Sequence, residues 1–155
     1  MAVSTTGERP DPPRAIALLP IAFLLHLAEE WFGGFSQWTL SILGNEVSPD
    51  RFVLINAATF AIFAIGTLAA FRYPRVAWLG ASFAALVGLN GVLHTLATVG
   101  FGYYSPGTVT GLLLYIPLSA GVLRSYVTVV SKPVLVRSIF FGVVMHGLVA
   151  LIAFF

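Results

Sequence analysis

The stretch AIALLPIAFLLHLAEEWF, residues 15–32, decides the fold, because it is a nearly unbroken apolar run that carries one imidazole and two carboxylates. Its length is close to the roughly 20 residues that a helix needs to cross the hydrocarbon core of a bilayer. On a helix, Glu29 and Glu30 follow His26 by three and four positions, so the three side chains point toward one face. Ionisable groups inside a membrane are costly unless they are paired or bind a ligand. This face is therefore the first candidate for a functional site.

The rest of the chain has the same apolar character. Its 155 residues are 58% hydrophobic and 9% charged, which predicts an all-α integral membrane protein. The net charge of +2 comes from scattered basic residues, so we expect no nucleic-acid partner. Cysteine is absent, which excludes disulfides, thiolate metal ligands and cysteine nucleophiles. Any metal site must use nitrogen and oxygen ligands.

Five apolar segments are long enough to cross the membrane. We place them at about residues 14–32, 52–71, 76–99, 108–123 and 134–155, with an interfacial loop or helix over residues 33–50. Prolines and charges in residues 1–14 are typical of a disordered tail, which we expect in the cytoplasm. Residues 15–155 are then expected to form a single bundle of five transmembrane helices.

The distribution of basic residues predicts the orientation of this bundle. The first and third connections are predicted to lie on the same side of the membrane as the C-terminus. Of the eight Lys and Arg residues, only Arg51 falls on that side. All the others fall in the N-terminal tail or near the loops on its side of the membrane. Basic residues favour the cytoplasmic side, so we expect the N-terminus in the cytoplasm and the C-terminus outside.

Polar side chains of all five spans are predicted to lie at a similar depth. Counted from the cytoplasmic ends at about 1.5 Å per residue, most of them fall roughly 20–25 Å into the membrane, with His94 a turn further out and His26 a turn further in. The groups in this polar layer are His26, Glu29, Glu30, Asn56, Asn90, His94, Thr108 and His146. For Asn56, an ordinary hydrogen bond between helices is an equally good interpretation, and for His146 a satisfied core histidine is.

A divalent cation is the simplest group that would satisfy the ionisable members of this layer. Imidazole and carboxylate ligands suit zinc, iron and manganese, and a mixed shell leaves a position for water or substrate. Zinc is our first choice, with iron or manganese as alternatives. One metal with supporting residues and part of a two-metal site both fit the spacing. The candidate ligands are His26, Glu29, Glu30, His94 and His146.

Three short motifs stand out along the chain. They are His26-x-x-Glu29-Glu30, Asn90-x-x-x-His94, and Tyr104-Ser105-Pro106-Gly107-Thr108 at the start of the fourth span. The Pro106-Gly107 break leaves free backbone amides at that helix start, where they can face an anionic group. Together the motifs resemble the bacterial HXXEE membrane-domain family. The resemblance implies a small helical protein of the bacterial inner or plasma membrane with a polar site, and it implies no particular reaction.

We expect a membrane-embedded, metal-dependent hydrolase that acts on a lipid-like or otherwise apolar small molecule. Glu29 or Glu30 would act as general base toward metal-activated water, and Asn90 and Tyr104 would orient the substrate or stabilise developing charge. A di-iron oxidoreductase is the enzymatic alternative. The polar layer also fits ion or small-solute binding or transport, which with five spans would need a homo-oligomer, or a partner subunit that docks through this layer.

Overall fold

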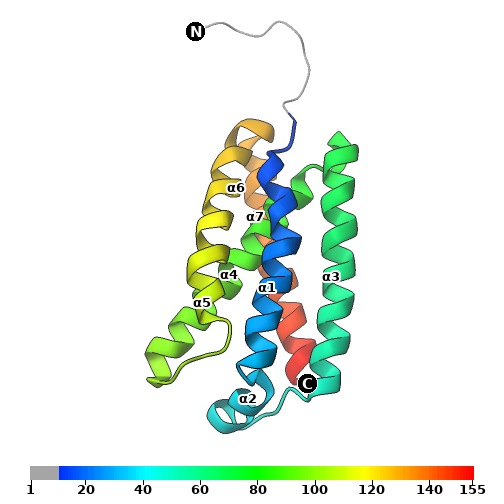
Figure 1. The fold of residues 1–155 in the computed structure, drawn as a ribbon. Helices are drawn as coiled ribbons and strands as arrows, with labels where there is room; N and C mark the ends of the chain where they lie inside the picture. The colour runs from blue at the N-terminus through cyan, green and yellow to red at the C-terminus, as the bar shows by residue number, and fades with distance from the viewer. Residues whose placement is uncertain (1–10) are drawn as a thin grey trace, which may run out of the picture.

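The computed structural model describes residues 11–155, and every regular element in that range is helical (Figure 1). Five helical segments are long and apolar enough to cross a membrane, which confirms the predicted all-α multi-pass class. They are Arg14–Phe32, Pro49–Arg72, Pro74–Phe101, Thr108–Val129 and Lys132–Phe154. Of the predicted disordered tail, residues 1–10 lie outside the described residues, and Arg14 already belongs to the first helical turn.

Each span is built from one to three helical elements. The first joins a 3-10 turn to an α-helix, and the fourth contains a π-helical turn, η3. A short helix, α2, lies between the first two spans, in the segment where an interfacial loop or helix is expected. The elements are η1 (Arg14–Ala17), α1 (Leu18–Phe32), α2 (Phe35–Leu43), α3 (Pro49–Arg72), η2 (Pro74–Val76), α4 (Trp78–Phe101), α5 (Thr108–Thr110), η3 (Gly111–Tyr115), α6 (Ile116–Val129) and α7 (Lys132–Phe154).

Local sequence signals explain several of these boundaries. Pro20 lies in the first turn of α1, where the missing N–H of proline is tolerated. At the start of α3, the Ser48 side chain accepts a hydrogen bond from the backbone N–H of Arg51, and proline follows it directly. α4 ends at Phe101, and the next residue, Gly102, caps it with a left-handed φ of 69° that suits a glycine.

The central element of the bundle is α4. Of its most apolar stretch, 56% of the residues are buried, compared with 11% for α7, and α4 packs against α3, α6 and α7. Small residues bring its neighbours close, because a side chain at Gly91 would meet the carbonyl oxygen of Gly111 at 2.9 Å. α4 therefore holds the side chains on its C-terminal half in fixed places among the other spans.

The described chain starts at one end of the bundle and finishes at the other, beside α2 (Figure 1). At this second end the last carbonyls of α7 are capped by side chains from the α2–α3 region. Arg51 Nη1 donates to the carbonyl oxygen of Ala153 at 3.3 Å, and Asn45 Nδ2 donates to that of Phe154 at 2.9 Å. The positive charge of Arg51 also complements the negative end of the helix dipole. The direction of the bundle relative to the membrane stays a prediction.

Candidate metal centre

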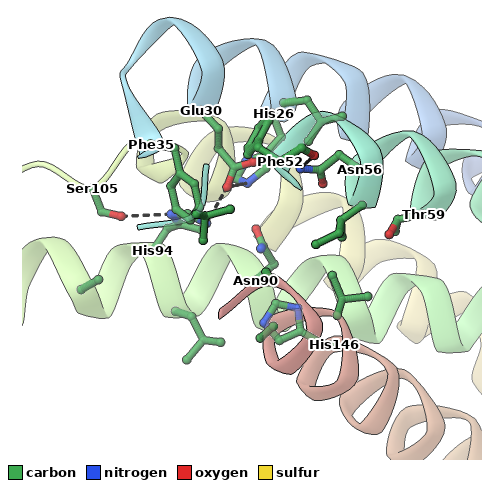
Figure 2. Close-up of a pocket in the computed structure, with 18 of the residues that line it drawn as sticks. His26, Glu30, Phe35, Phe52, Asn56, Thr59, Asn90, His94, Ser105 and His146 are labelled. Atoms are coloured by element: carbon green, nitrogen blue, oxygen red, sulfur yellow. Dashed lines mark hydrogen bonds and ion pairs between the residues drawn. The ribbon is translucent and has the colours of Figure 1, made fainter. Parts of the chain in front are cut away.

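Glu30 lies between two imidazoles near the α2 end of the bundle. Its Oε1 atom is 3.5 Å from His26 Nε2, one turn earlier on α1, and 3.2 Å from His94 Nε2 on α4 (Figure 2). One potential ligand atom from each of the three residues lies within 4.8 Å of the other two, and all three side chains are buried. The structure thus brings together three of the five predicted ligands. We call this group the His-Glu-His cluster.

Hydroxyl groups hold the far side of both imidazole rings. His26 Nδ1 is 2.8 Å from Thr110 Oγ1, and His94 Nδ1 is 3.0 Å from Ser105 Oγ. Histidines that bind metals usually make such a bond through the second ring nitrogen, which sets the ring orientation. Both Nε2 atoms are therefore turned toward Glu30.

The ligand atoms of the His-Glu-His cluster fit a divalent cation. His26 Nε2 is a buried ring nitrogen without a hydrogen-bond partner among residues 11–155, and it faces a carboxylate oxygen. Two imidazole nitrogens and a carboxylate oxygen form a ligand set that suits zinc, iron or manganese. His26, Glu30 and His94 are the residues that would hold the ion.

Glu29 points away from the cluster and onto the start of the fourth span. Its Oε1 accepts hydrogen bonds from the backbone N–H groups of Gly107 at 3.1 Å and Val109 at 2.9 Å, and from the Tyr104 hydroxyl. Its Oε2 accepts from the N–H and the hydroxyl of Thr110, at 2.6 and 2.5 Å. The free amides expected at this helix start do face an anionic group, and that group is Glu29 itself.

Tyr104 lies between the third and fourth spans and is one of the groups that donate a hydrogen bond to Glu29. Partial burial, together with its hydrogen bond to the Glu29 carboxylate, raises the pKa of Tyr104 to about 12. The phenol therefore remains a hydrogen-bond donor at neutral pH. The Tyr104 hydroxyl bonds Glu29, and Tyr104 does not line the cavity next to the cluster, so its predicted catalytic role gains no support from this position.

A largely apolar cavity of about 250 Å³ lies next to the His-Glu-His cluster. His146 of α7 and Asn90 of α4 line it on the side away from Glu30, and Asn56 of α3 lines it as well (Figure 2). The Oδ1 atom of Asn90 is buried and has no hydrogen-bond partner among the described residues. His146 belongs to the cavity wall and not to the three-residue cluster. Most other lining residues are hydrophobic, among them Phe23, Leu27, Phe35, Phe52, Ile55, Leu86, Leu93 and Val149.

Sequence reasoning missed two residues that shape the cluster. Thr110 bonds both His26 and Glu29, and Tyr115 stacks on the His26 ring with centroids 4.3 Å apart. The spacing gave one signal for Thr110, because it follows the Pro106-Gly107 break by less than a turn and carries a hydroxyl at a helix start. Nothing in the pattern marked Tyr115, since its position depends on the π-helical turn.

Proteins of unknown function with an HXXEE motif form a family that matches residues 17–122 of the chain. The chain belongs to this family. The HXXEE match contains His26, Glu30 and His94, whereas His146 lies beyond it. Among curated proteins, the chain is similar to the uncharacterized protein YrkK of Bacillus subtilis (strain 168), with 27% identity over 149 residues, covering 88% of this chain and 92% of YrkK. No solved structure matches.

Proposed function

We propose that this HXXEE protein is a metal-dependent enzyme of the bacterial inner membrane that hydrolyses an apolar, lipid-like substrate. One observation carries the proposal: the His-Glu-His cluster forms a polar end of a largely apolar cavity between the spans. A cavity of this kind, apolar with a few convergent polar groups, is typical of small-molecule sites. Its location inside the bundle favours a ligand that partitions into the membrane.

Each residue of the cluster has a specific task in this proposal. His26, Glu30 and His94 would bind the ion, with zinc as first choice, and three protein ligands leave a position open for water or substrate. When bound, the ion supplies Lewis acidity and lowers the pKa of a bound water. Thr110 and Ser105 hold the two imidazoles in the orientation that this binding requires.

The residues on the opposite wall of the cavity would orient the substrate and transfer protons. Asn90 Oδ1 is buried there and has no hydrogen-bond partner within residues 11–155, so its amide is suited to orient a polar group of the substrate. Glu29 already accepts five hydrogen bonds, which makes it a poor general base. We assign proton transfer to His146, which lines the same cavity.

The ligand set favours this chemistry over a di-iron oxidoreductase. Di-iron sites in helical bundles commonly draw a carboxylate from each of four helices. The cluster offers the single carboxylate of Glu30 within residues 11–155. A mononuclear site is the simpler proposal.

Metal analysis of the detergent-purified protein tests the proposal first. We expect about one equivalent of zinc, iron or manganese in the wild type, and loss of that metal in Glu30→Gln and His94→Asn, because each variant removes one of three ligands. Glu46→Gln, which changes an exposed carboxylate in the α2–α3 loop, is the matched control and should keep the metal. A folded wild type that takes up none of the three metals would contradict the site.

Substrate hydrolysis is the second measurement. We expect the metal-loaded wild type to release product from long-chain acyl esters or amides in mixed micelles, and Glu30→Gln to be inactive. Metal binding without turnover of any such substrate would contradict the hydrolase and leave the metal site in place.

A further inference from the structure

We infer that Glu29 is a positioning residue that acts through the Thr110 hydroxyl to hold the proton of His26 on Nδ1, so that the Nε2 lone pair faces Glu30. This inference deepens the proposed metal site, yet its central test uses metal-free protein. It assigns separate tasks to the two adjacent acids of the motif. Glu30 faces the ion position, and Glu29 sets the protonation pattern of the neighbouring ligand.

The first step is that Glu29 serves only as a hydrogen-bond acceptor. Three of its five partners are backbone N–H groups, which can only donate. The side chain therefore presents two acceptor oxygens to the start of the fourth span. Oε2 is the oxygen that the Thr110 hydroxyl reaches.

The second step concerns the single proton of the Thr110 hydroxyl. Thr110 Oγ1 is 2.5 Å from Glu29 Oε2 and 3.4 Å from the carbonyl oxygen of Gly107, so the short bond to Glu29 takes the proton. The lone pairs of Oγ1 are then left for its remaining neighbour. That neighbour is His26 Nδ1, at 2.8 Å, which must act as the donor.

The third step follows from the chemistry of neutral imidazole, which carries one proton. With that proton on Nδ1, the lone pair of Nε2 points at Glu30 Oε1 across 3.5 Å. Two acceptors that face each other in a buried site repel, unless a cation or a proton lies between them. We call the chain of hydrogen bonds from Glu29 through Thr110 to His26 the relay. It leaves the lone pair of His26 Nε2 available to bind an ion.

His94 provides an internal comparison. Its Nδ1 is 3.0 Å from the Ser105 hydroxyl, and either atom can be the donor in that bond. In residues 11–155, no hydrogen bond links Glu29 or Thr110 to the Ser105 hydroxyl. Changes at Glu29 or Thr110 should therefore act on His26 and spare His94.

Nitrogen NMR of the full-length, metal-free protein tests the relay. The protein is labelled with ¹⁵N-histidine, stripped with a chelator and kept in detergent, and its three histidines are assigned with His→Asn variants. We expect wild-type His26 to show a protonated Nδ1, because this is the ring nitrogen that bonds the Thr110 hydroxyl. Thr110→Val, which keeps the shape and removes the hydroxyl, should move the proton toward Nε2, whereas Thr110→Ser should retain the wild-type pattern.

Two further variants make the comparison specific. Glu29→Gln should change His26 as Thr110→Val does, because it replaces one acceptor oxygen by a donor group. Thr67→Val is the matched control, since the Thr67 hydroxyl is buried in α3 without a hydrogen-bond partner in the described chain. The control should leave all three histidines unchanged.

Metal affinity gives a second readout. Removing a partner of a metal-binding histidine commonly lowers affinity by about 10–100-fold, and we expect a loss of that size for Thr110→Val with rescue by Thr110→Ser. A wild-type His26 with an unprotonated Nδ1 would overturn the relay even if every variant failed to fold. A His26 pattern that Thr110→Val leaves unchanged would also overturn it.

The outcomes for the relay and for the metal site can be told apart. If the wild type binds no metal but Thr110→Val moves the His26 proton, the relay stands and the proposed enzyme fails. If metal binds and the proton does not respond to Thr110→Val, the relay fails and the metal site stands.

Discussion

Gly107 is the residue at which both imidazoles and the start of the fourth span meet. Its φ of +102° lies in the left-handed region, which favours glycine. A Cβ atom at this position would lie 2.6 Å from the His26 ring and 3.0 Å from the His94 ring. Its backbone N–H also donates to Glu29. The glycine of the Pro-Gly break is therefore part of the wall of the His-Glu-His cluster.

Gly107→Ala is expected to destabilise the protein more than Gly102→Ala does. Gly102 also has a left-handed φ, of +69°, but a Cβ there would have open space around it. The control should lose about 1–2 kcal/mol for the backbone alone, and Gly107→Ala should lose more because it also displaces two imidazoles. Thermal unfolding in detergent measures the difference, and metal analysis should show a loss for Gly107→Ala alone. Equal effects of the two substitutions would contradict this account of the cluster.

At the scale of elements, the start of the fourth span differs most from its predicted form. The apolar pattern predicts one helix over residues 108–123, whereas the structure has α5, the π-helical turn η3 and then α6. Single π turns inside helices often occur at functional sites. Here the turn brings Tyr115 against the His26 ring and Gly111 against Gly91 of α4. A π turn adds one residue to a helix, and this change is too small to be seen in the hydrophobic periodicity. The position of the π turn therefore becomes visible only in the tertiary contacts.

Gly91→Ala should weaken the packing of α4 against this turn. The added methyl group would meet the carbonyl oxygen of Gly111 at 2.9 Å and Tyr115 Cβ at 3.1 Å, so the two spans must move apart. Gly121→Ala in α6 is the control, because its Cβ would have open space and alanine favours a helix. We expect a lower midpoint of thermal unfolding for Gly91→Ala and an equal or higher one for Gly121→Ala. A Gly91→Ala protein as stable as the wild type would show that the two spans do not pack this closely.

At the scale of the whole molecule, the cluster lies toward one end of the bundle. Glu30 is in the last turn of α1, and α2 follows it directly after the Gly33-Gly34 turn. Phe35 of α2 packs near the His94 ring, with centroids 5.9 Å apart, and lines the cavity. The cavity is thus bounded by the spans and, at this end, by α2. If the basic residues mark the cytoplasmic side, the cluster faces the outer leaflet.

Cysteine labelling tests this orientation directly, because the natural chain has no cysteine. Glu46→Cys in the α2–α3 loop and Ser131→Cys in the turn before α7 place single thiols on exposed residues at opposite ends of the bundle. In intact cells with a permeable outer envelope, we expect a membrane-impermeant maleimide to label Glu46→Cys. Ser131→Cys should react only after the membrane is opened. The reverse pattern would place the N-terminus outside.

The sequence alone determined the membrane class, the five spans and the placing of His26 and Glu30 on one face of the first span; it placed Glu29 on that face as well. These features depend on composition and on helical periodicity, which are local and can be read along one segment. The polar layer was also foreseen in outline, since Asn56, Asn90 and His146 do line one cavity.

Only the tertiary structure decided which members of that layer meet. Glu29 and Glu30 are adjacent in sequence, but their side chains leave α1 in directions about 100° apart. One therefore reaches His94, and the other reaches the start of the fourth span. The packing of α1 against both α4 and that span sets these partners. Helix periodicity contains no information about which neighbour lies on each side.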